Sequence, residues 1–162
     1  MGTTGHSVSE KPANRSRKSR QALRLWLRLL TSTRFVEKRI QALMRDQDTT
    51  LPRFDALAAL SRNPEGVTMG ELSRRLLVSN GNVTGIITRL EEEGLVAREP
   101  LETDRRTYVT RITPTGEADL QRVLPLHEDL IDSMFSDMTS AEMEVLITLL
   151  DKVRASLKRH GA

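Results

Sequence analysis

TMGELSRRLLVSNGNVTGIITRLEEEGLVAREPLETDRRTYVTRIT, the stretch from Thr68 to Thr113, decides the fold of this 162-residue chain. It contains two short helical patterns separated by a tight turn, and then two strand patterns that flank a basic loop. This order predicts a winged helix-turn-helix, in which the second helix enters the major groove of DNA and a β-ribbon lies beside it.

The second helical pattern follows Ser79, a residue type that often caps helix N-termini. Its apolar residues recur at the spacing i, i+3, i+4, i+7 of a single helical face and are Val83, Ile86, Ile87 and Leu90. The sequence therefore predicts a short recognition helix that packs by this face.

The opposite face of the same helix is small and polar, and its two glycines each cost about 1 kcal/mol of helix stability relative to alanine. Such a face permits close approach and offers hydrogen bonds to base edges and phosphates. An ordinary surface helix is the alternative, but the flanking elements favour DNA binding. The predicted DNA contacts on this helix are Ser79, Asn80, Gly81, Asn82, Thr84, Thr88 and Arg89.

Helix and strand boundaries surround this segment. Thr68 and Glu71 form a T-x-x-E capping box that begins the first helix of the pair. Gly94 marks the end of the second helix. Branched and aromatic residues then predict strands at 95–98 and 107–112.

The loop between these strands, residues 100–106, carries Asp104, Arg105 and Arg106. An arginine at a ribbon tip suits a narrow minor groove, where the negative potential is strongest. Asp104 can orient a guanidinium through a bidentate pair. We therefore expect all three residues at the DNA, the alternative being a surface hairpin with a salt bridge.

This segment contains five short motifs, namely Leu72-Ser73-Arg74-Arg75-Leu76, Val78-Ser79 with Asn82-Val83-Thr84, Leu90-Glu91 with Gly94-Leu95-Val96, Asp104-Arg105-Arg106, and Ile112-Thr113-Pro114-Thr115-Gly116. Together they closely resemble the MarR family of bacterial transcription regulators. The resemblance covers residues 23–157, and the wing followed by T-P-x-G is its most specific part. It implies that Arg106 is the family's minor-groove arginine and that Asp104 orients it.

Helical periodicity continues on both sides of the winged segment. The segment 23–44 is apolar on two sides, so we expect it to pack against its own winged region and against a partner chain. We predict a mainly α fold with a small β-wing, in which residues 21–162 form one domain. Residues 21–50 and 114–160 would be dimerisation helices around a winged helix-turn-helix at 52–113. A homodimer suits a palindromic operator on double-stranded DNA, because its half-sites lie about one helical turn apart.

Residues 1–20 are polar and include Lys11, Arg15, Arg17, Lys18 and Arg20. This composition predicts a disordered basic arm. The arm would either follow the DNA backbone or serve as a solubilising terminus.

The MarR resemblance implies a small effector bound between the dimerisation and winged layers. For the apolar, aromatic and histidine candidates the plain alternative is the hydrophobic core, and for the arginines it is a long dimerisation helix whose arginine side chains extend along apolar surface. The predicted ligand-binding residues are Trp26, Arg28, Leu30, Arg34, Phe35, Phe54 and His127.

Three further runs look like the MarR branch that responds to hydroxycinnamoyl-CoA thioesters, namely 25–30 (LWLRLL), 50–55 (TLPRFD) and 70–76 (GELSRRL). This implies an aryl group near Trp26 and Phe54, with CoA phosphates on Arg24, Arg28 or Arg34. It predicts a repressor of aromatic-compound catabolism that an aryl-CoA such as p-coumaroyl-CoA releases. The alternatives are release by a free phenolic ligand, and a winged-helix protein-interaction module that does not bind DNA.

Other functions lack sequence support. There is no cysteine, so a thiol sensor is excluded, and the three histidines (His6, His127 and His160) show no metal-ligand spacing. We find no G-x-S-x-G and no phosphate-binding glycine loop, so we expect neither an enzyme nor a cofactor. No signal peptide or membrane-spanning run is apparent, and a cytoplasmic location is expected.

Overall fold

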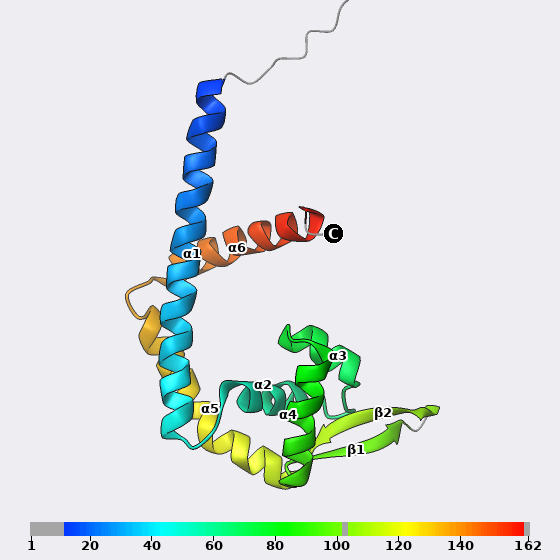
Figure 1. Cartoon of the computed structure of the whole chain (residues 1–162). Coiled ribbons are helices and arrows are strands. Elements are labelled where there is room, and N and C mark those ends of the chain that lie inside the picture. Colours follow the sequence, from blue (N-terminus) through cyan, green and yellow to red (C-terminus); the bar gives the residue numbers. More distant parts are fainter. Residues whose placement is uncertain (1–11, 102–103, 161–162) are drawn as a thin grey trace, which may run out of the picture. The chain divides into compact units, whose positions relative to one another are not determined.

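The computed structural model describes residues 12–101 and 104–160 (Figure 1). The chain is mainly helical with one two-stranded antiparallel sheet in this part, as the sequence predicts. Its elements are α1 (Pro12–Asp46), α2 (Leu51–Ser61), α3 (Met69–Leu76), α4 (Asn80–Glu92), β1 (Val96–Leu101), β2 (Asp104–Ile112), α5 (Pro114–Phe135) and α6 (Ser140–His160).

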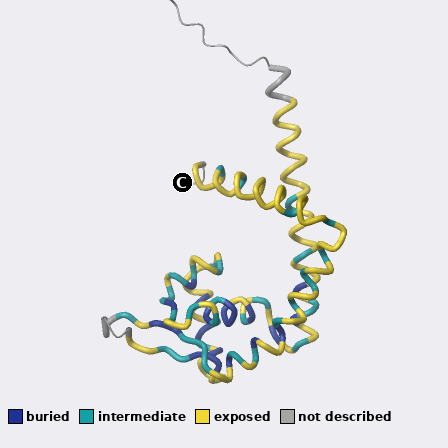
Figure 2. The backbone as a smooth tube through the Cα atoms, turned by 180° about the vertical axis from the view of Figure 1, so that it is seen from behind, coloured by how far each residue is buried: buried dark blue, intermediate teal, exposed yellow. Residues whose placement is uncertain are grey.

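The described residues divide into two compact units after Arg39. In the second unit, the buried residues lie at the end of α1, in α2 to β2 and in the first half of α5 (Figure 2). We call α2 to β2 the winged region. Its core includes Phe54, Leu57, Leu60, Val67, Leu72, Val83, Ile87, Leu90, Val96 and Val109.

The predicted caps of the helix-turn-helix are confirmed. Thr68 Oγ1 accepts a hydrogen bond from the Glu71 backbone N–H at 3.3 Å, and the Glu71 carboxylate accepts one from the Thr68 N–H at 3.1 Å. At the other end of the pair, Gly94 has φ +71° and donates to Glu91 O at 2.9 Å, while Leu95 donates to Leu90 O at 2.8 Å. These two bonds are a Schellman motif, which a glycine favours because its φ is positive.

β1 and β2 pair from Val96–Ile112 to Leu101–Asp104, with a register shift between Pro100 and Leu101. The predicted strands at 95–98 and 107–112 are therefore too short, and most of the predicted loop 100–106 belongs to the strands. Charged and proline residues lower the intrinsic strand preference of this segment, but backbone pairing carries both strands further.

The Thr113–Gly116 motif has a packing reason. Thr113 Oγ1 accepts from the Gly116 N–H at 3.0 Å and donates to Gly94 O at 2.8 Å. A Cβ on Gly116 would lie 2.0 Å from the Leu95 carbonyl oxygen, so no larger residue fits without a shift. The motif therefore joins the start of α5 to the end of α4.

The first helix begins earlier than predicted. α1 starts at Pro12, so the expected disordered arm is wrong for residues 12–20, which are helical. Proline is favoured in the first helical turn, and alanine and arginine favour helix, which outweighs the polar composition. Residues 1–11 of the predicted arm lie outside the described residues.

Large apolar side chains are exposed on α1 and α6. On α1 they are Leu23, Leu25, Trp26, Leu27 and Phe35, and on α6 they are Val145, Leu146, Ile147, Leu149, Leu150 and Leu157. Among the helices described here, none is long and apolar enough to cross a membrane.

Candidate nucleic-acid interface

α4 presents its small face to solvent. Val83, Ile87 and Leu90 are completely buried, which fixes the rotation of the helix about its axis. Gly81 and Gly85 are on the exposed side, and a Cβ added to either would meet nothing within 4 Å. The space directly over these two glycines is therefore unoccupied.

The polar side chains of α4 differ in their availability. Asn82 and Arg89 are exposed, as is Thr84, whose hydroxyl donates to Asn80 O at 2.9 Å. Ser79 Oγ is the N-cap and accepts from the Asn82 N–H at 3.4 Å. The N-terminal turns of α4 thus offer both side-chain and backbone donors to a ligand.

Thr88, by contrast, is half-buried and already has a partner. Its Oγ1 accepts a hydrogen bond from Arg98 Nη2 at 3.2 Å, and Arg98 Nε lies 3.4 Å from Glu91 Oε2. Arg98 therefore braces β1 against α4. Sequence reasoning missed this residue, because Arg98 and Thr88 are ten positions apart and the chain reverses at Gly94 between them.

The three wing residues are strand residues rather than loop residues. Asp104 pairs with Leu101 at the tip of the sheet, and Arg105 and Arg106 follow it in β2. Their side chains lie outside the described residues, so the Asp104–arginine pair stays a prediction.

A groove of about 680 Å³ separates the N-terminus of α2 from α4, and Gly81, Asn82, Gly85 and Arg89 form its α4 wall. Arg53 and Glu93 form an ion pair across it. This hydrogen bond raises the pKa of Arg53 and lowers that of Glu93. α2 is therefore attached to the C-terminal end of α4.

A second pocket, of about 630 Å³, lies beside α2 and α5. The rings of Phe54 and His127, both predicted ligand residues, meet there with centroids 4.7 Å apart and planes inclined at 40°. The full lining is Phe54, Asp55, Ala58, Ala59, Arg62, Asn63, Arg75, Leu76 and His127. We call this the Phe54–His127 pocket.

The charged groups of the Phe54–His127 pocket were not predicted. Arg75 Nη1 donates to Asn63 Oδ1 at 2.9 Å, which holds one guanidinium at the wall. Desolvation raises the pKa of Asp55, and His127 and Arg62 oppose this increase electrostatically. The arrangement combines two aromatic rings, two arginines and one carboxylate.

The other predicted ligand residues are all on α1, where they divide between two faces. At about 100° per residue, Trp26, Leu30 and Arg34 share one side, whereas Arg28 and Phe35 lie on the opposite side. One copy of α1 therefore cannot present all five to a single ligand. The sequence predicts a helix that is apolar on two sides, and the predicted ligand residues come from both sides.

The comparisons with known proteins agree with this geometry. A model of the MarR family matches residues 47–107. An uncharacterised HTH-type transcriptional regulator of Bacillus cereus is 32% identical over 130 residues, which cover 80% of this chain and 86% of the relative. The chain belongs to the MarR family.

Two further relatives extend this MarR assignment. The HTH-type transcriptional repressor IacR of Pseudomonas putida is 28% identical over 119 residues, covering 74% of this chain and 71% of IacR. The crystal structure of a mutant Escherichia coli MarR complexed with operator DNA has a TM-score of 0.73 and 25% identity, covering 82% of this chain and 95% of that one. The chain is a MarR-type DNA-binding transcriptional regulator, and members of this family are not enzymes.

Proposed function

We propose that this MarR-type regulator represses aromatic-compound catabolism and leaves its operator when it binds an aryl-CoA thioester such as p-coumaroyl-CoA. The observation that carries the proposal is the Phe54–His127 pocket, where aromatic rings lie beside two arginines. Its volume of about 630 Å³ is within the usual range for small-ligand sites.

The aromatic end suits the aryl group. Phe54 is buried and His127 half-buried, so the two rings offer a planar ligand a partly desolvated stacking surface. Asp55 and His127 offer hydrogen bonds to a phenolic hydroxyl. A free phenolic acid would satisfy these groups as well, and it is the alternative effector.

The basic end suits the CoA part. Arg62 and Arg75 line the pocket, and arginine binds phosphate oxygens in bidentate geometry. The thioester carries phosphates that a free phenolic acid lacks, so these arginines favour the thioester. On α1, Trp26, Leu30 and Arg34 share a face and stay proposed ligand residues, while Arg28 and Phe35 are on the opposite face.

Release follows from the connection between the pocket and α4. Phe54 lines the Phe54–His127 pocket, and the adjacent residue, Arg53, pairs with Glu93 at the end of the recognition helix. A ligand that displaces α2 therefore displaces α4. The effector needs only a preference of about 1–3 kcal/mol for the displaced state.

The DNA-bound form we propose is a homodimer. The exposed apolar residues of α1 and α6 would be covered by a second copy, with dimerisation helices at 21–50 and 114–160. Two copies of the winged segment 52–113 would then contact a palindromic operator in the cytoplasm, with half-sites about one helical turn apart. The proposed base and backbone contacts are Ser79, Asn80, Gly81, Asn82, Thr84, Thr88, Arg89, Asp104, Arg105 and Arg106.

The effector proposal is tested by fluorescence anisotropy on the duplex upstream of the protein's own gene, titrated with p-coumaroyl-CoA, free p-coumarate and free CoA. Release by the thioester alone supports the proposal. Release by p-coumarate points to the phenolic alternative. Tight operator binding that is unaffected by all three compounds would contradict an aryl-CoA effector.

The release route has its own test, Arg53→Gln. We expect this variant to bind p-coumaroyl-CoA as the wild type does. The factor by which the thioester reduces operator affinity should be at least five times smaller in the variant than in the wild type. Arg122→Gln is the matched control, because Arg122 pairs with Asp119 in α5 and donates to Gln47 Oε1 and Gln47 O, so its contacts hold α5 rather than α4. Equal release from both variants would contradict a route through Arg53.

A further inference from the structure

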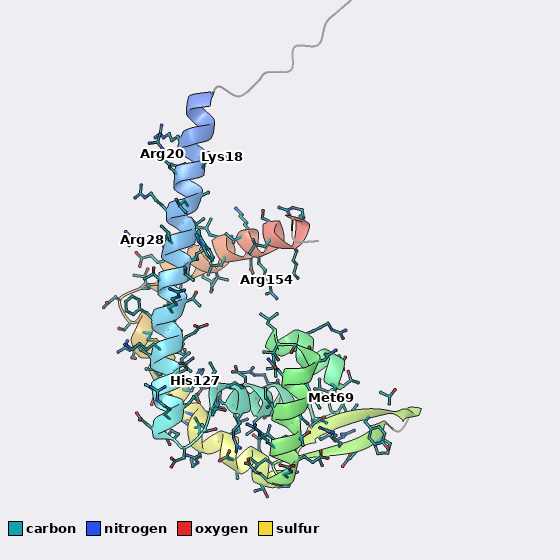
Figure 3. All side chains as sticks on the ribbon, viewed as in Figure 1. Lys18, Arg20, Arg28, Met69, His127 and Arg154 are labelled. Carbon is teal, nitrogen blue, oxygen red and sulfur yellow. The ribbon has the colours of Figure 1, made fainter. Side chains whose placement is uncertain are left out.

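Four arginines line one side of α1. Arg17, Arg20, Arg24 and Arg28 recur at i, i+3, i+7 and i+11, so they fall within about 80° of the helix circumference. All four are exposed, and Figure 3 shows Arg20 and Arg28 on the same side of the helix. We call these four residues the arginine stripe.

The arginine stripe lies opposite one of the two apolar strips of α1, the strip that contains Trp26. Trp26 is nine residues from Arg17, which places it about 180° away, and Leu23 and Leu30 are on the same side as Trp26. The apolar strip therefore remains available to another protein chain while the arginine stripe faces outward.

Charge is distributed very unevenly between this helix and the winged segment. Residues 11–36 contain eight basic residues and no acidic residue. In the helix-turn-helix and wing, residues 68–113, seven basic residues are balanced by seven acidic ones. The acidic residues are Glu71, Glu91, Glu92, Glu93, Glu99, Glu102 and Asp104. The positive charge that favours DNA is therefore concentrated on α1.

The arginine stripe is unfavourable for an isolated helix. Arg20, Arg24 and Arg28 are spaced four residues apart, so neighbouring like charges repel. Arg17 is near the helix N-terminus, where the helix dipole also disfavours positive charge, and the first turn of α1 has no acidic residue. A polyanion bound along the stripe would relieve both effects.

We propose that the arginine stripe binds the phosphate backbone of double-stranded DNA outside the base pairs that α4 and the wing contact. The chain is a DNA-binding regulator, and residues 68–113 carry no net positive charge, so basic residues elsewhere can add to the sequence-independent part of its affinity. From Arg17 to Arg28 the stripe is about 16 Å long, which matches the rise of about five base pairs. The contact adds affinity and no base preference, because phosphates are the same at every base pair.

The test measures the salt dependence of operator affinity for an operator selected in vitro from random duplexes by the purified protein. Two lengths of duplex are used, one that just spans both half-sites and one extended by about ten base pairs at each end. The stripe variant carries R17Q, R20Q, R24Q and R28Q. The control carries K152Q, R154Q, K158Q and R159Q on α6, which removes the same number of charges.

On the extended duplex, we expect the stripe variant to bind at least tenfold more weakly than the control. The slope of log K against log salt should fall by about 0.9 for each phosphate that the stripe variant no longer neutralises. The preference for the operator over a scrambled duplex should not change. Equal affinities and slopes for the stripe and control variants would overturn the proposal.

Wild-type protein provides a second measurement that does not depend on the folding of any variant. Its salt slope should be steeper on the extended duplex than on the short one, and its helicity by circular dichroism should rise more when the extended duplex is added. A quadruple arginine-to-lysine variant should keep the steep slope, since binding to phosphates needs the charge. Identical wild-type slopes on both duplexes would also overturn the proposal.

Discussion

The winged region and the two long terminal helices bury their apolar residues very differently. Leu72, Val83 and Ile87 are completely buried within a single chain, whereas Trp26 on α1 is 56% exposed and Leu150 on α6 is 40% exposed. The winged region therefore has its own core. α1 and α6 have apolar faces that a single chain leaves open, which is the physical basis for proposing a second copy.

The largest effect should come from the winged core. Leu72→Ala removes a fully buried side chain and should lower the free energy of unfolding by about 2–5 kcal/mol. Leu77→Ala is the control in the same helix-turn-helix, because Leu77 is 88% exposed and should change stability by less than about 0.5 kcal/mol. Urea unfolding measures both, and similar losses would contradict the packing described for α3.

The next effect should appear in assembly rather than in the fold of the winged region. Leu150→Glu places a charge in the apolar face of α6 and should weaken dimerisation by about 10- to 100-fold, which corresponds to about 1.4–2.7 kcal/mol. Thr148→Glu, on the opposite side of α6, is the control. Sedimentation velocity over a range of protein concentrations distinguishes them. Unchanged association of Leu150→Glu would mean that this face of α6 is not the dimer interface.

The helix caps should contribute less, and their contribution should depend on pH. Thr68→Ala removes the N-cap of α3 and should cost about 0.5–2 kcal/mol at neutral pH. Hydrogen bonds from Thr68 lower the pKa of Glu71, so their stabilisation is complete above about pH 4.3 and is lost as the pH falls through the lowered folded-state pKa.

The loss of stability in Thr68→Ala should therefore be smaller at pH 3 than at pH 7, as measured by urea unfolding at both values. Thr139→Ala removes the equivalent cap of α6 and tests the comparison between the two regions. A larger loss of winged-region stability from Thr139→Ala than from Thr68→Ala would reverse the comparison.

The smallest change in stability should be an increase. Gly85→Ala adds a methyl group in open space within α4 and should stabilise the fold by about 0.5–1 kcal/mol. It should also weaken operator binding, because it fills the space over the small face. Gly94→Ala should destabilise instead, since φ is +71° at that position. Thermal unfolding measures the stability and fluorescence anisotropy measures the operator affinity. Unchanged operator affinity in Gly85→Ala would mean that DNA does not contact the small face of α4.

The range of a stabilising contact along the chain decides which features the sequence predicts. The Thr68–Glu71 capping box and the Gly94 stop depend on residues no more than five positions apart, and both are confirmed. The Arg53–Glu93 pair joins residues 40 positions apart, and no local pattern indicates it. Its existence depends on how α2 packs beside α4, which periodicity does not specify.

The same reasoning applies to the candidate effector pocket. Phe54 and His127 were predicted as ligand residues, and they meet because α2 packs on α5. Arg62 and Arg75 were missed, since an exposed arginine on a helix has the same sequence signal whether or not a pocket lies beside it. Pro12 did carry a usable signal for the start of α1, but the charged, polar composition around it outweighed that signal in the prediction.

The most direct test of the proposed effector site is calorimetric titration of p-coumaroyl-CoA into the protein without DNA, using wild type and His127→Ala. We expect saturable binding of one thioester per chain to the wild type, weakened about tenfold or more in His127→Ala. Circular dichroism should show that the variant remains folded, because His127 is only half-buried. No binding to the wild type, or equal binding to both proteins, would contradict an effector site in the Phe54–His127 pocket.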